Sequence, residues 1–180
     1  DRVQAQLATL GANRLTVRPG AGWFTGGRDR GARLSIDDAR AVQEGASSVT
    51  TVVPVLQRNA SVEHGTLSSN MEVIGTWVNW PRVNGWELDR GRFFTEAEQA
   101  GRRRVAIIGS EVAEDLFPDF LDPIGAWIRL NGVQFEVIGV LASKGDTGFR
   151  NQDDTVVVPL STAQYRLFGT EYLSSFVAEA

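Results

Sequence analysis

The sequence has 180 residues, of which 42% are hydrophobic, enough for one sizeable globular domain or for two small ones that share a core. The formal net charge is -4, which argues against a nucleic-acid partner because a surface that binds phosphates needs a basic face. There is no cysteine, so a disulfide framework and a cysteine-ligated metal are both excluded.

The N-terminal part of the chain predicts a helix, a strand and a loop. Apolar residues recur at helical spacing in "DRVQAQLATLGAN" (1–13), and "NRLTVRP" (13–19) alternates apolar and polar residues as a half-buried strand does. The glycine-rich loop that follows carries Trp23 and Phe24, which are candidate contacts for a protein partner. No stretch of the sequence approaches the ~18 apolar residues that a membrane crossing needs.

Three segments carry a capping box, in which a Ser or Thr and an acid or amide three residues later satisfy the free amides of a helix start. The three pairs are Ser35 with Asp38, Thr95 with Glu98, and Ser161 with Gln164. Asp37 and Asp38 could also be considered as metal ligands or as a general base. Acidic residues in a first turn already gain from the helix dipole, so we favour the structural interpretation.

The segment "SVTTVVPVLQRNASVEHGTLSSNMEVIGTWVNW" (48–80) alternates or runs apolar, with polar interruptions, and predicts two or three antiparallel strands. His64 lies near a turn within it. A single histidine with no cysteine and no second ligand at metal-binding spacing makes a poor metal site, so we expect an exposed loop histidine.

Three of the five tryptophans, Trp77, Trp80 and Trp86, lie within ten residues of one another. Such a cluster either forms part of the core or exposes some of its rings to a partner, since tryptophan is enriched at binding hot spots. We favour the core and keep Trp77 and Trp80 as candidate partner contacts beside Trp23 and Phe24.

The stretch "VAIIGSEVAEDLF" (105–117) predicts a buried strand, a turn and a helix with Ser110 as its cap. A dinucleotide-binding turn needs three glycines at fixed spacing, whereas Gly109 is alone here. Glu111 and Glu114 would also place negative charge where a phosphate must sit. We therefore disfavour a nucleotide site, and we read the preceding arginines, 102–104, as a solvated loop with no site assigned.

The segment "DPIGAWIRLNGVQFEVIGVL" (122–141) contains Asn131-Gly132 between alternating runs, the strongest short-range signal for a β-hairpin. A two-residue turn sets the register and puts the apolar residues on one face. The predicted pairs are Leu130 with Val133, Arg129 with Gln134, and Ile128 with Phe135, and the polar face collects Arg129, Gln134 and Glu136.

The last third of the chain ends in a polar loop, a strand, a helix and a strand. Asp146, Asp153 and Asp154 lie in the loop without the spacing or the closing glutamate of an EF-hand, so no calcium site is expected. "VVVPL" (156–160) predicts a buried strand, "LSTAQYRLFG" (160–169) a helix that stops at its glycine, and "YLSSFVAEA" (172–180) a final strand.

Taken in order, seven segments resemble the periplasmic core domain of MacB-like ABC transporter permeases. They are "LGANRLTVRPG", "LSIDDARAV", "GRFFTEAE", "RRVAIIGSEVAEDLF", "DPIGAWIRLNGVQFEVIGVL", "DDTVVVPLSTAQYRLFG" and "YLSSFVAEA". The resemblance covers nearly the whole chain, and seven segments in order are far more specific than any one of them. The family continues with a further helix and strand, so the resemblance implies that this sequence is truncated at its C-terminal end.

The resemblance implies an α+β fold with two lobes. A porter-like α/β lobe would be made from both ends of the chain, residues 1–85 and 171–180, and a mixed α+β lobe called Sabre would be inserted as residues 86–170. The domain would lie on the outer face of the bacterial cytoplasmic membrane, in the periplasm or at the cell surface, between flanking transmembrane helices that this sequence lacks.

The resemblance also implies a function. Paired as a dimer with a second permease protomer, the domain would couple ATP hydrolysis by a cytoplasmic ABC ATPase to outer-domain motion that exports or releases a substrate, with an adaptor or another envelope protein as a further partner. No catalytic residue, cofactor or metal is expected in the domain itself. Two alternatives stay open: a sensor or scaffold domain of a related permease that regulates cell-envelope enzymes, and a nucleotide-binding enzyme.

Overall fold

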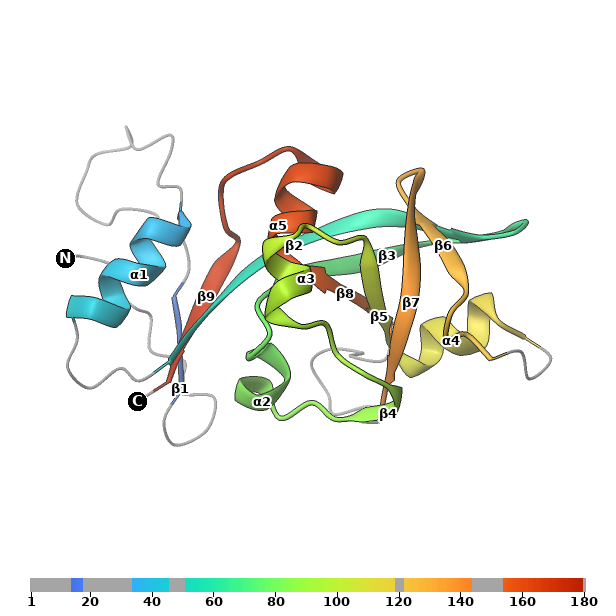
Figure 1. The fold of residues 1–180 in the computed structure, drawn as a ribbon, viewed down its shortest axis with the longest axis horizontal. Coiled ribbons are helices and arrows are strands. Elements are labelled where there is room, and N and C mark those ends of the chain that lie inside the picture. The colour runs from blue at the N-terminus through green and yellow to red at the C-terminus, as the bar shows by residue number, and fades with distance from the viewer. Residues whose placement is uncertain (1–13, 18–33, 46–50, 119–121, 144–153, 180) are drawn as a thin grey trace. The chain divides into compact units, whose positions relative to one another are not determined.

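The computed structural model describes residues 14–17, 34–45, 51–118, 122–143 and 154–179 (Figure 1). Backbone contacts divide the chain into two units. The first consists of Asp1–Leu56 and Glu171–Ala180, and the second of Gln57–Thr170. Both units contain helices and strands, and the strands pair in parallel and in antiparallel fashion, so the fold is α+β with a mixed sheet.

The contact units and the predicted lobes divide the chain at different places on the N-terminal side. The lobes were predicted to meet after residue 85, whereas the contact units meet after Leu56. Residues 57–85 fall in the second unit because their strands pair with other strands of that unit. On the C-terminal side both divisions fall after Thr170. The assignment of the units to porter-like and Sabre lobes stays a prediction.

In the part that the structure describes, the first unit is a small antiparallel sheet with one helix. Strand β9 (Ser175–Glu179) lies between β1 (Arg14–Val17) and the first half of β2 (Thr51–His64), antiparallel to both. Helix α1 (Ile36–Gly45) precedes β2, and its Ala39 is fully buried. The other buried hydrophobic side chains described in this unit are Leu34, Val52, Val53, Val55, Leu56, Leu173, Phe176, Val177 and Ala178.

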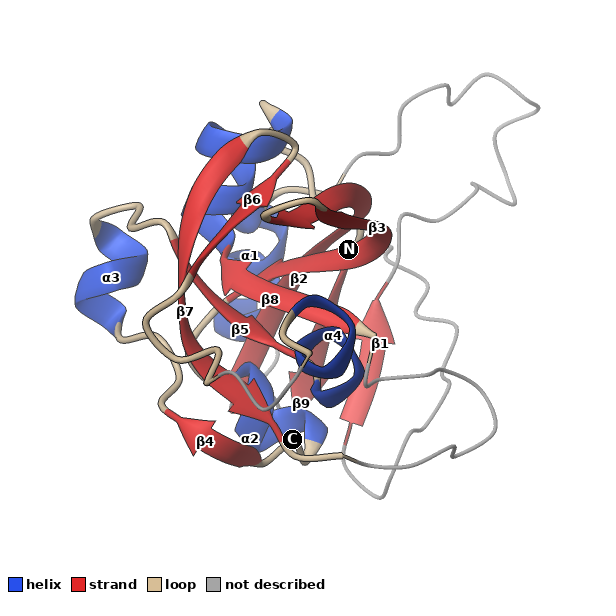
Figure 2. Ribbon diagram, turned by 90° about the vertical axis from the view of Figure 1, so that its right-hand side faces the viewer, coloured by secondary structure: helices blue, strands red, loops and turns tan. Residues whose placement is uncertain are grey.

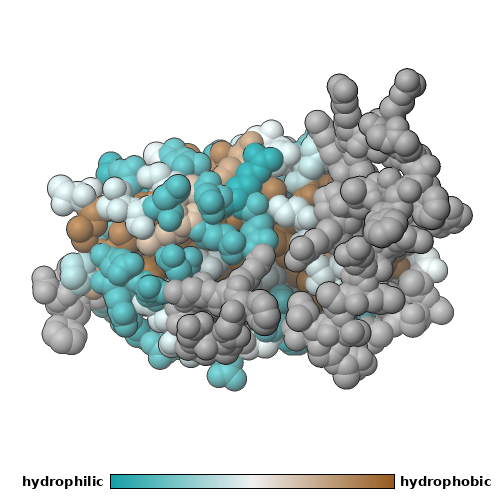
Figure 3. Space-filling view, turned by 180° about the vertical axis from the view of Figure 1, so that it is seen from behind, coloured by the Kyte–Doolittle hydropathy of each residue, from teal (hydrophilic) through white to brown (hydrophobic). Residues whose placement is uncertain are grey.

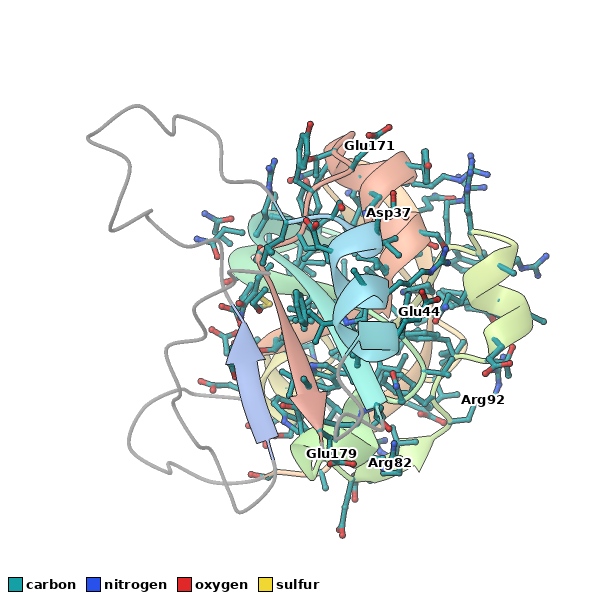
Figure 4. The ribbon with its side chains drawn as sticks, turned by 90° about the vertical axis from the view of Figure 1, so that its left-hand side faces the viewer. Asp37, Glu44, Arg82, Arg92, Glu171 and Glu179 are labelled. Carbon is teal, nitrogen blue, oxygen red and sulfur yellow. The ribbon has the colours of Figure 1, made fainter. Side chains whose placement is uncertain are left out.

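The capping box predicted for α1 is confirmed. The Asp38 carboxylate accepts a hydrogen bond from the Ser35 amide at 3.0 Å, and the Ser35 hydroxyl accepts one from the Asp38 amide at 3.3 Å. The side chains of Asp37, Asp38 and Glu44 are exposed, and Figure 4 labels Asp37 and Glu44 on α1. Asp38 therefore caps the helix, and Asp37 lies exposed in its first turn.

The second unit is built on a closed barrel of six strands (Figure 2). Around the barrel each strand is hydrogen-bonded to the next in the order β2, β3, β8, β5, β7, β6, and β6 returns to β2. Besides β2, the barrel strands are β3 (Leu67–Thr76), β8 (Thr155–Pro159), β5 (Val105–Ile108), β7 (Val133–Leu141) and β6 (Trp127–Leu130). The pairs β3 with β8 and β5 with β7 are parallel. Closure removes the free edges that an open sheet would expose.

The predicted β-hairpin is confirmed in register. The three predicted pairs of β6 and β7 are the observed ones, and Asn131 and Gly132 form the turn with φ values of 48° and 83°. Ile128, Leu130 and Phe135 are at most 1% exposed, while Arg129 and Gln134 face the solvent. The alternation therefore sorted the apolar residues into the core and the polar ones onto the outer face.

The helices of the second unit lie outside the barrel strands (Figure 1). Their bounds, with that of the short strand β4, are α2 (Trp80–Asn84), β4 (Leu88–Gly91), α3 (Glu96–Ala100), α4 (Ser110–Leu116), α5 (Leu160–Thr162) and the π-helical turn η1 (Ala163–Phe168). Gly169 ends η1 in the left-handed conformation, as its place after the helix predicted.

Two predicted helix caps are wrong. Gly109, and not Ser110, occupies the cap position of α4, with no side-chain hydrogen bond there. The last helix starts after Pro159, so Ser161 lies inside it and donates its hydroxyl proton to the carbonyl oxygen of Gln99 instead. Only Gly109 lies between the end of β5 at Ile108 and the start of α4, and β8 ends at Pro159, directly before the start of α5. Each serine therefore lies within the first turn of its helix and not before it.

The capping box of α3 is confirmed and is extended by an arginine. The Thr95 hydroxyl accepts from the Glu98 amide at 3.2 Å, the Glu98 carboxylate accepts from the Thr95 amide at 3.0 Å, and Arg92 donates to the same carboxylate at 2.7 and 3.1 Å. Figure 4 shows Arg92 close to this helix. The hydrogen bond from Arg92, opposed by partial burial and aided by the bond from Thr95, lowers the pKa of Glu98.

Replacing Glu98 by alanine should lower the free energy of unfolding at pH 7 by about 0.5–2 kcal/mol, the usual cost of a lost cap. Because the pKa of Glu98 is lowered in the fold, its contribution is present above the ordinary glutamate pKa of about 4.3 and is lost as the pH falls through the lowered value. Urea unfolding at pH 7 and pH 3 checks this. Glu96→Ala, at an exposed position of the same first turn, is the control, and an equal cost for both variants at pH 7 would contradict the prediction.

Candidate functional site

The tryptophan cluster belongs mainly to the core of the second unit. Trp80 is 4% exposed, and its ring centroid lies 4.6 Å from that of Trp86 and 6.5 Å from that of Phe93. Trp77 is half-buried. Trp80 thus presents almost no surface to a partner, while a partner contact by Trp77 stays a prediction. Trp23 and Phe24, the other two candidates, lie outside the described residues.

His64 is not the exposed loop histidine that the sequence predicted. It ends strand β2, is half-buried, and donates from Nδ1 to the carbonyl oxygen of Leu116 at 2.8 Å. Its ring packs against the ring of Phe117 in a tilted arrangement, with 4.1 Å between the ring centroids. The imidazole therefore satisfies one of the free carbonyls at the end of α4, which is a structural role.

The acidic residues of the described chain do not form a metal centre. Among the residues that the structure describes, no group of three or more histidine, aspartate or glutamate side chains is placed to hold a metal ion. Burial raises the pKa of Asp154, and the neighbouring carboxylates of Glu111, Asp115 and Glu72 raise it further. Asp146 and Asp153, which the sequence placed in the same loop, lie outside the described residues.

The turn between β5 and α4 lacks the geometry of a nucleotide site. Gly109 has an ordinary extended conformation, with φ of -69° and ψ of 161°, and α4 has only seven residues. Glu114 is exposed and Glu111 half-buried in the first turns. Nothing on this turn offers the glycine cradle or the positive charge that a pyrophosphate requires.

An open groove of about 320 Å³ lies on the outer face of the barrel, lined by Glu63, Gly65, Trp127, Arg129 and Gln134. Trp127 is 55% exposed, and Arg129 forms an ion pair with Glu63 at 3.1 Å. The groove contains no nucleophile or acid–base pair, and its charged pair is already satisfied, so it offers contact area and no chemistry. The hairpin register that placed Ile128 in the core also placed Trp127 outside, so the alternation in the sequence is the signal for this exposed tryptophan.

Polar and apolar residues are interspersed on the visible surface of the described chain. On the face seen in Figure 3, hydrophobic areas are small and are separated by hydrophilic residues. The large hydrophobic side chains that are exposed are Leu67, Leu88, Trp127, Tyr165 and Tyr172. Of the helices in the described part of the chain, none combines the length and apolar character that a membrane crossing requires.

The first and last described strands lie side by side. In the antiparallel pair β1 and β9, Arg14 at the start of one strand stands opposite Glu179 at the end of the other. Figure 4 shows Glu179 at the tip of β9, next to β1. The start of β1 and the end of β9 therefore lie at the same end of one sheet.

Comparison with known proteins decides the family. The model of the MacB-like periplasmic core domain matches residues 1–180. The chain belongs to this family. The match confirms the recognition predicted from the seven segments and the predicted location outside the cytoplasmic membrane.

Relatives of this MacB-like domain are much longer proteins. The chain is 36% identical over 176 residues to the macrolide export ATP-binding/permease protein MacB of Bdellovibrio bacteriovorus, covering 96% of the chain and 27% of that protein. It is 35% identical over 169 residues to the pyoverdine export ATP-binding/permease protein PvdT of Pseudomonas putida, covering 93% and 25%. The chain spans about a quarter of the length of these relatives.

Solved structures confirm the α+β fold. The periplasmic region of MacB from Actinobacillus actinomycetemcomitans matches with a TM-score of 0.77 at 23% identity, covering 94% of this chain and 75% of that one. The extracellular domain of the noncanonic ABC-type transporter YknZ from Gram-positive bacteria matches with a TM-score of 0.71 at 22% identity, covering 82% and 73%.

Proposed function

We propose that this MacB-like domain is the outer moving part of an export ATP-binding/permease protein. ATP hydrolysis on the cytoplasmic side of the membrane would change the arrangement of two such domains, one from each permease protomer of a dimer, and this motion would drive the export or release of a substrate. The domain itself would have no catalytic role and would bind no cofactor. An adaptor or another envelope protein is the further partner that we propose.

The observation that carries the proposal is the pairing of β1 with β9. A domain inserted between two membrane helices must send both of its connections toward the same side, and the opposition of Arg14 and Glu179 in neighbouring strands supports such an insertion. A movement of the two membrane helices would then act on one sheet. The units made of Asp1–Leu56 with Glu171–Ala180 and of Gln57–Thr170 are candidates for the porter-like and the Sabre lobe.

The chemistry of the described residues agrees with mechanical coupling. The carboxylates singled out in the sequence cap helices, lie exposed on a first turn or repel one another at Asp154, and the groove at Trp127 contains no reactive pair. The two relatives export chemically different compounds according to their names, so we propose export without naming the cargo.

Spin labels on the full-length protein that carries this domain would test the proposal. The domain has no cysteine, so a single cysteine at the exposed position Glu114 reports the distance between the two protomers once cysteines elsewhere are replaced. ATP binding should change this distance, while the distance between labels at Glu96 and Glu114 within one domain stays constant.

An unchanged distance between the protomers, together with intact export after deletion of the domain, would overturn the proposal in favour of a sensor or scaffold. Saturable thermal stabilisation of the 180-residue chain by ATP or NAD would instead support the alternative of a nucleotide-binding enzyme.

A further inference from the structure

The run of arginines between α3 and β5 meets η1 in space. Arg102 and Arg103 lie about sixty residues from Tyr165 and Arg166 along the chain, yet the Arg102 guanidinium carbon is 3.7 Å from the centroid of the Tyr165 ring. We call these four residues the arginine–tyrosine surface. All four are exposed, and Tyr165 is 58% exposed.

Two hydroxyl groups hold the backbone of this surface together. Ser161 and Thr162 on α5 donate to the carbonyl oxygens of Gln99 and Arg103, the second at 2.8 Å. Thr162 is fully buried. The turn that carries the arginines is therefore fixed against the helix that carries the tyrosine, and the surface is formed before any partner arrives.

Arg102 has an unusual backbone. Its φ of 51° lies in the left-handed region, which glycine normally occupies after a helix, although Gly101 is directly before it with φ of -82°. A non-glycine residue in this conformation costs about 1–2 kcal/mol. The strained turn places the Arg102 side chain over the Tyr165 ring, an arrangement that limits the freedom of its guanidinium.

The positive charge of the surface is not neutralised within the described chain. The ion pairs between described residues involve Arg90, Arg92 and Arg129. Arg102, Arg103 and Arg166 have no ion-pair partner among the described residues, although the chain as a whole carries a net charge of -4.

We infer that the arginine–tyrosine surface binds an acidic segment of a protein partner. A guanidinium that stacks on an aromatic ring keeps its planar fork free for a bidentate carboxylate, and arginine and tyrosine are both enriched at binding hot spots. A nucleic acid is a poorer fit because the remaining acidic surface would repel its phosphates. This inference concerns the surface of the chain itself and holds whether or not the proposed coupling is correct.

Selection from a random library of twelve-residue peptides on the immobilised 180-residue chain tests the inference. The recovered peptides should be enriched in aspartate and glutamate. For one recovered peptide, the Kd should rise at least about tenfold in the double variant Arg102→Glu, Arg166→Glu, and binding should weaken in 0.5 M salt. Tyr165→Ser should also weaken binding, because the stack that orients Arg102 is lost.

The matched control is the double variant Arg40→Glu, Arg82→Glu, which reverses two exposed arginines elsewhere. Each double variant changes the formal charge by four units, from -4 to -8, so the two variants have the same net charge. The inference would be overturned if the recovered peptides showed no acidic enrichment, or if both double variants lost equal affinity for the peptide. The chain can also be sedimented with phosphatidylglycerol vesicles. If the chain sediments with them, the Arg102→Glu, Arg166→Glu variant does not, and the recovered peptides show no acidic enrichment, the surface binds a membrane instead.

Discussion

Gly91→Ala is expected to destabilise the chain by about 2–5 kcal/mol, the sum of a left-handed alanine and an overpacked contact. Gly91 ends β4 with φ of 73° and pairs with Gly139 of β7. A Cβ atom there would collide with the carbonyl oxygen of Ile138 and would lie 2.8 Å from the Cα atom of Gly139. The same carbonyl accepts a hydrogen bond from Arg92 at 3.0 Å, so the two backbones cannot easily move apart.

Two other glycines separate the two causes of the destabilisation expected for Gly91→Ala, the left-handed backbone and the steric crowding. Gly125 has φ of 86° with nothing within 4 Å of an added Cβ, so Gly125→Ala should show the backbone term alone, about 1–2 kcal/mol. Gly75 has no positive φ, but its added Cβ would collide with the Cβ atom of Ala163, so Gly75→Ala should show the crowding alone. Urea unfolding gives all three values. A cost for Gly91→Ala no greater than that for Gly125→Ala would show that β4 and β7 are not in close contact.

Phe135→Ala should lower the free energy of unfolding by about 3–5 kcal/mol, the range measured when a buried phenylalanine is truncated. Phe135 is completely buried in β7, opposite Ile128 of β6, and is among the largest fully buried side chains described. Its loss would leave a cavity that a closed barrel cannot easily collapse, because each strand is held by neighbours on both sides.

The control is Gln134→Ala, one residue earlier on the same strand and exposed on the outer face. Its effect should stay within about 0.5 kcal/mol, as for most surface changes. Denaturant unfolding at constant pH measures both variants. Similar losses of unfolding free energy in the two variants would mean that β7 does not separate a buried face from an exposed one, and would contradict the hairpin register.

Local patterns in the sequence predicted those features that depend on neighbouring residues. Asn131-Gly132 needs only its own backbone preferences to turn the chain, and the alternation on either side is enough to set the register of β6 and β7. Likewise Thr95 and Glu98 are three residues apart, so a capping box forms within one helical turn. The same logic failed at Ser110 and Ser161, because the packing of the preceding strand decided where each helix starts.

The candidate surfaces were harder to predict, because they join residues from distant parts of the chain. His64 of β2 donates a hydrogen bond to the carbonyl oxygen of Leu116 in α4, a residue 52 positions away in the sequence. The sequence predicted a solvated loop for the arginine run, whereas in the structure Arg102 lies over the ring of Tyr165.

The sequence by itself determined the family, the helix caps at Ser35 and Thr95, and the β6–β7 hairpin, since each rests on short-range preferences or on an ordered series of segments. Only the tertiary structure decided the closure of the barrel and the pairing of β1 with β9. Both bring together residues far apart in the chain, and the burial that stabilises such contacts depends on the whole fold. No local pattern specifies it.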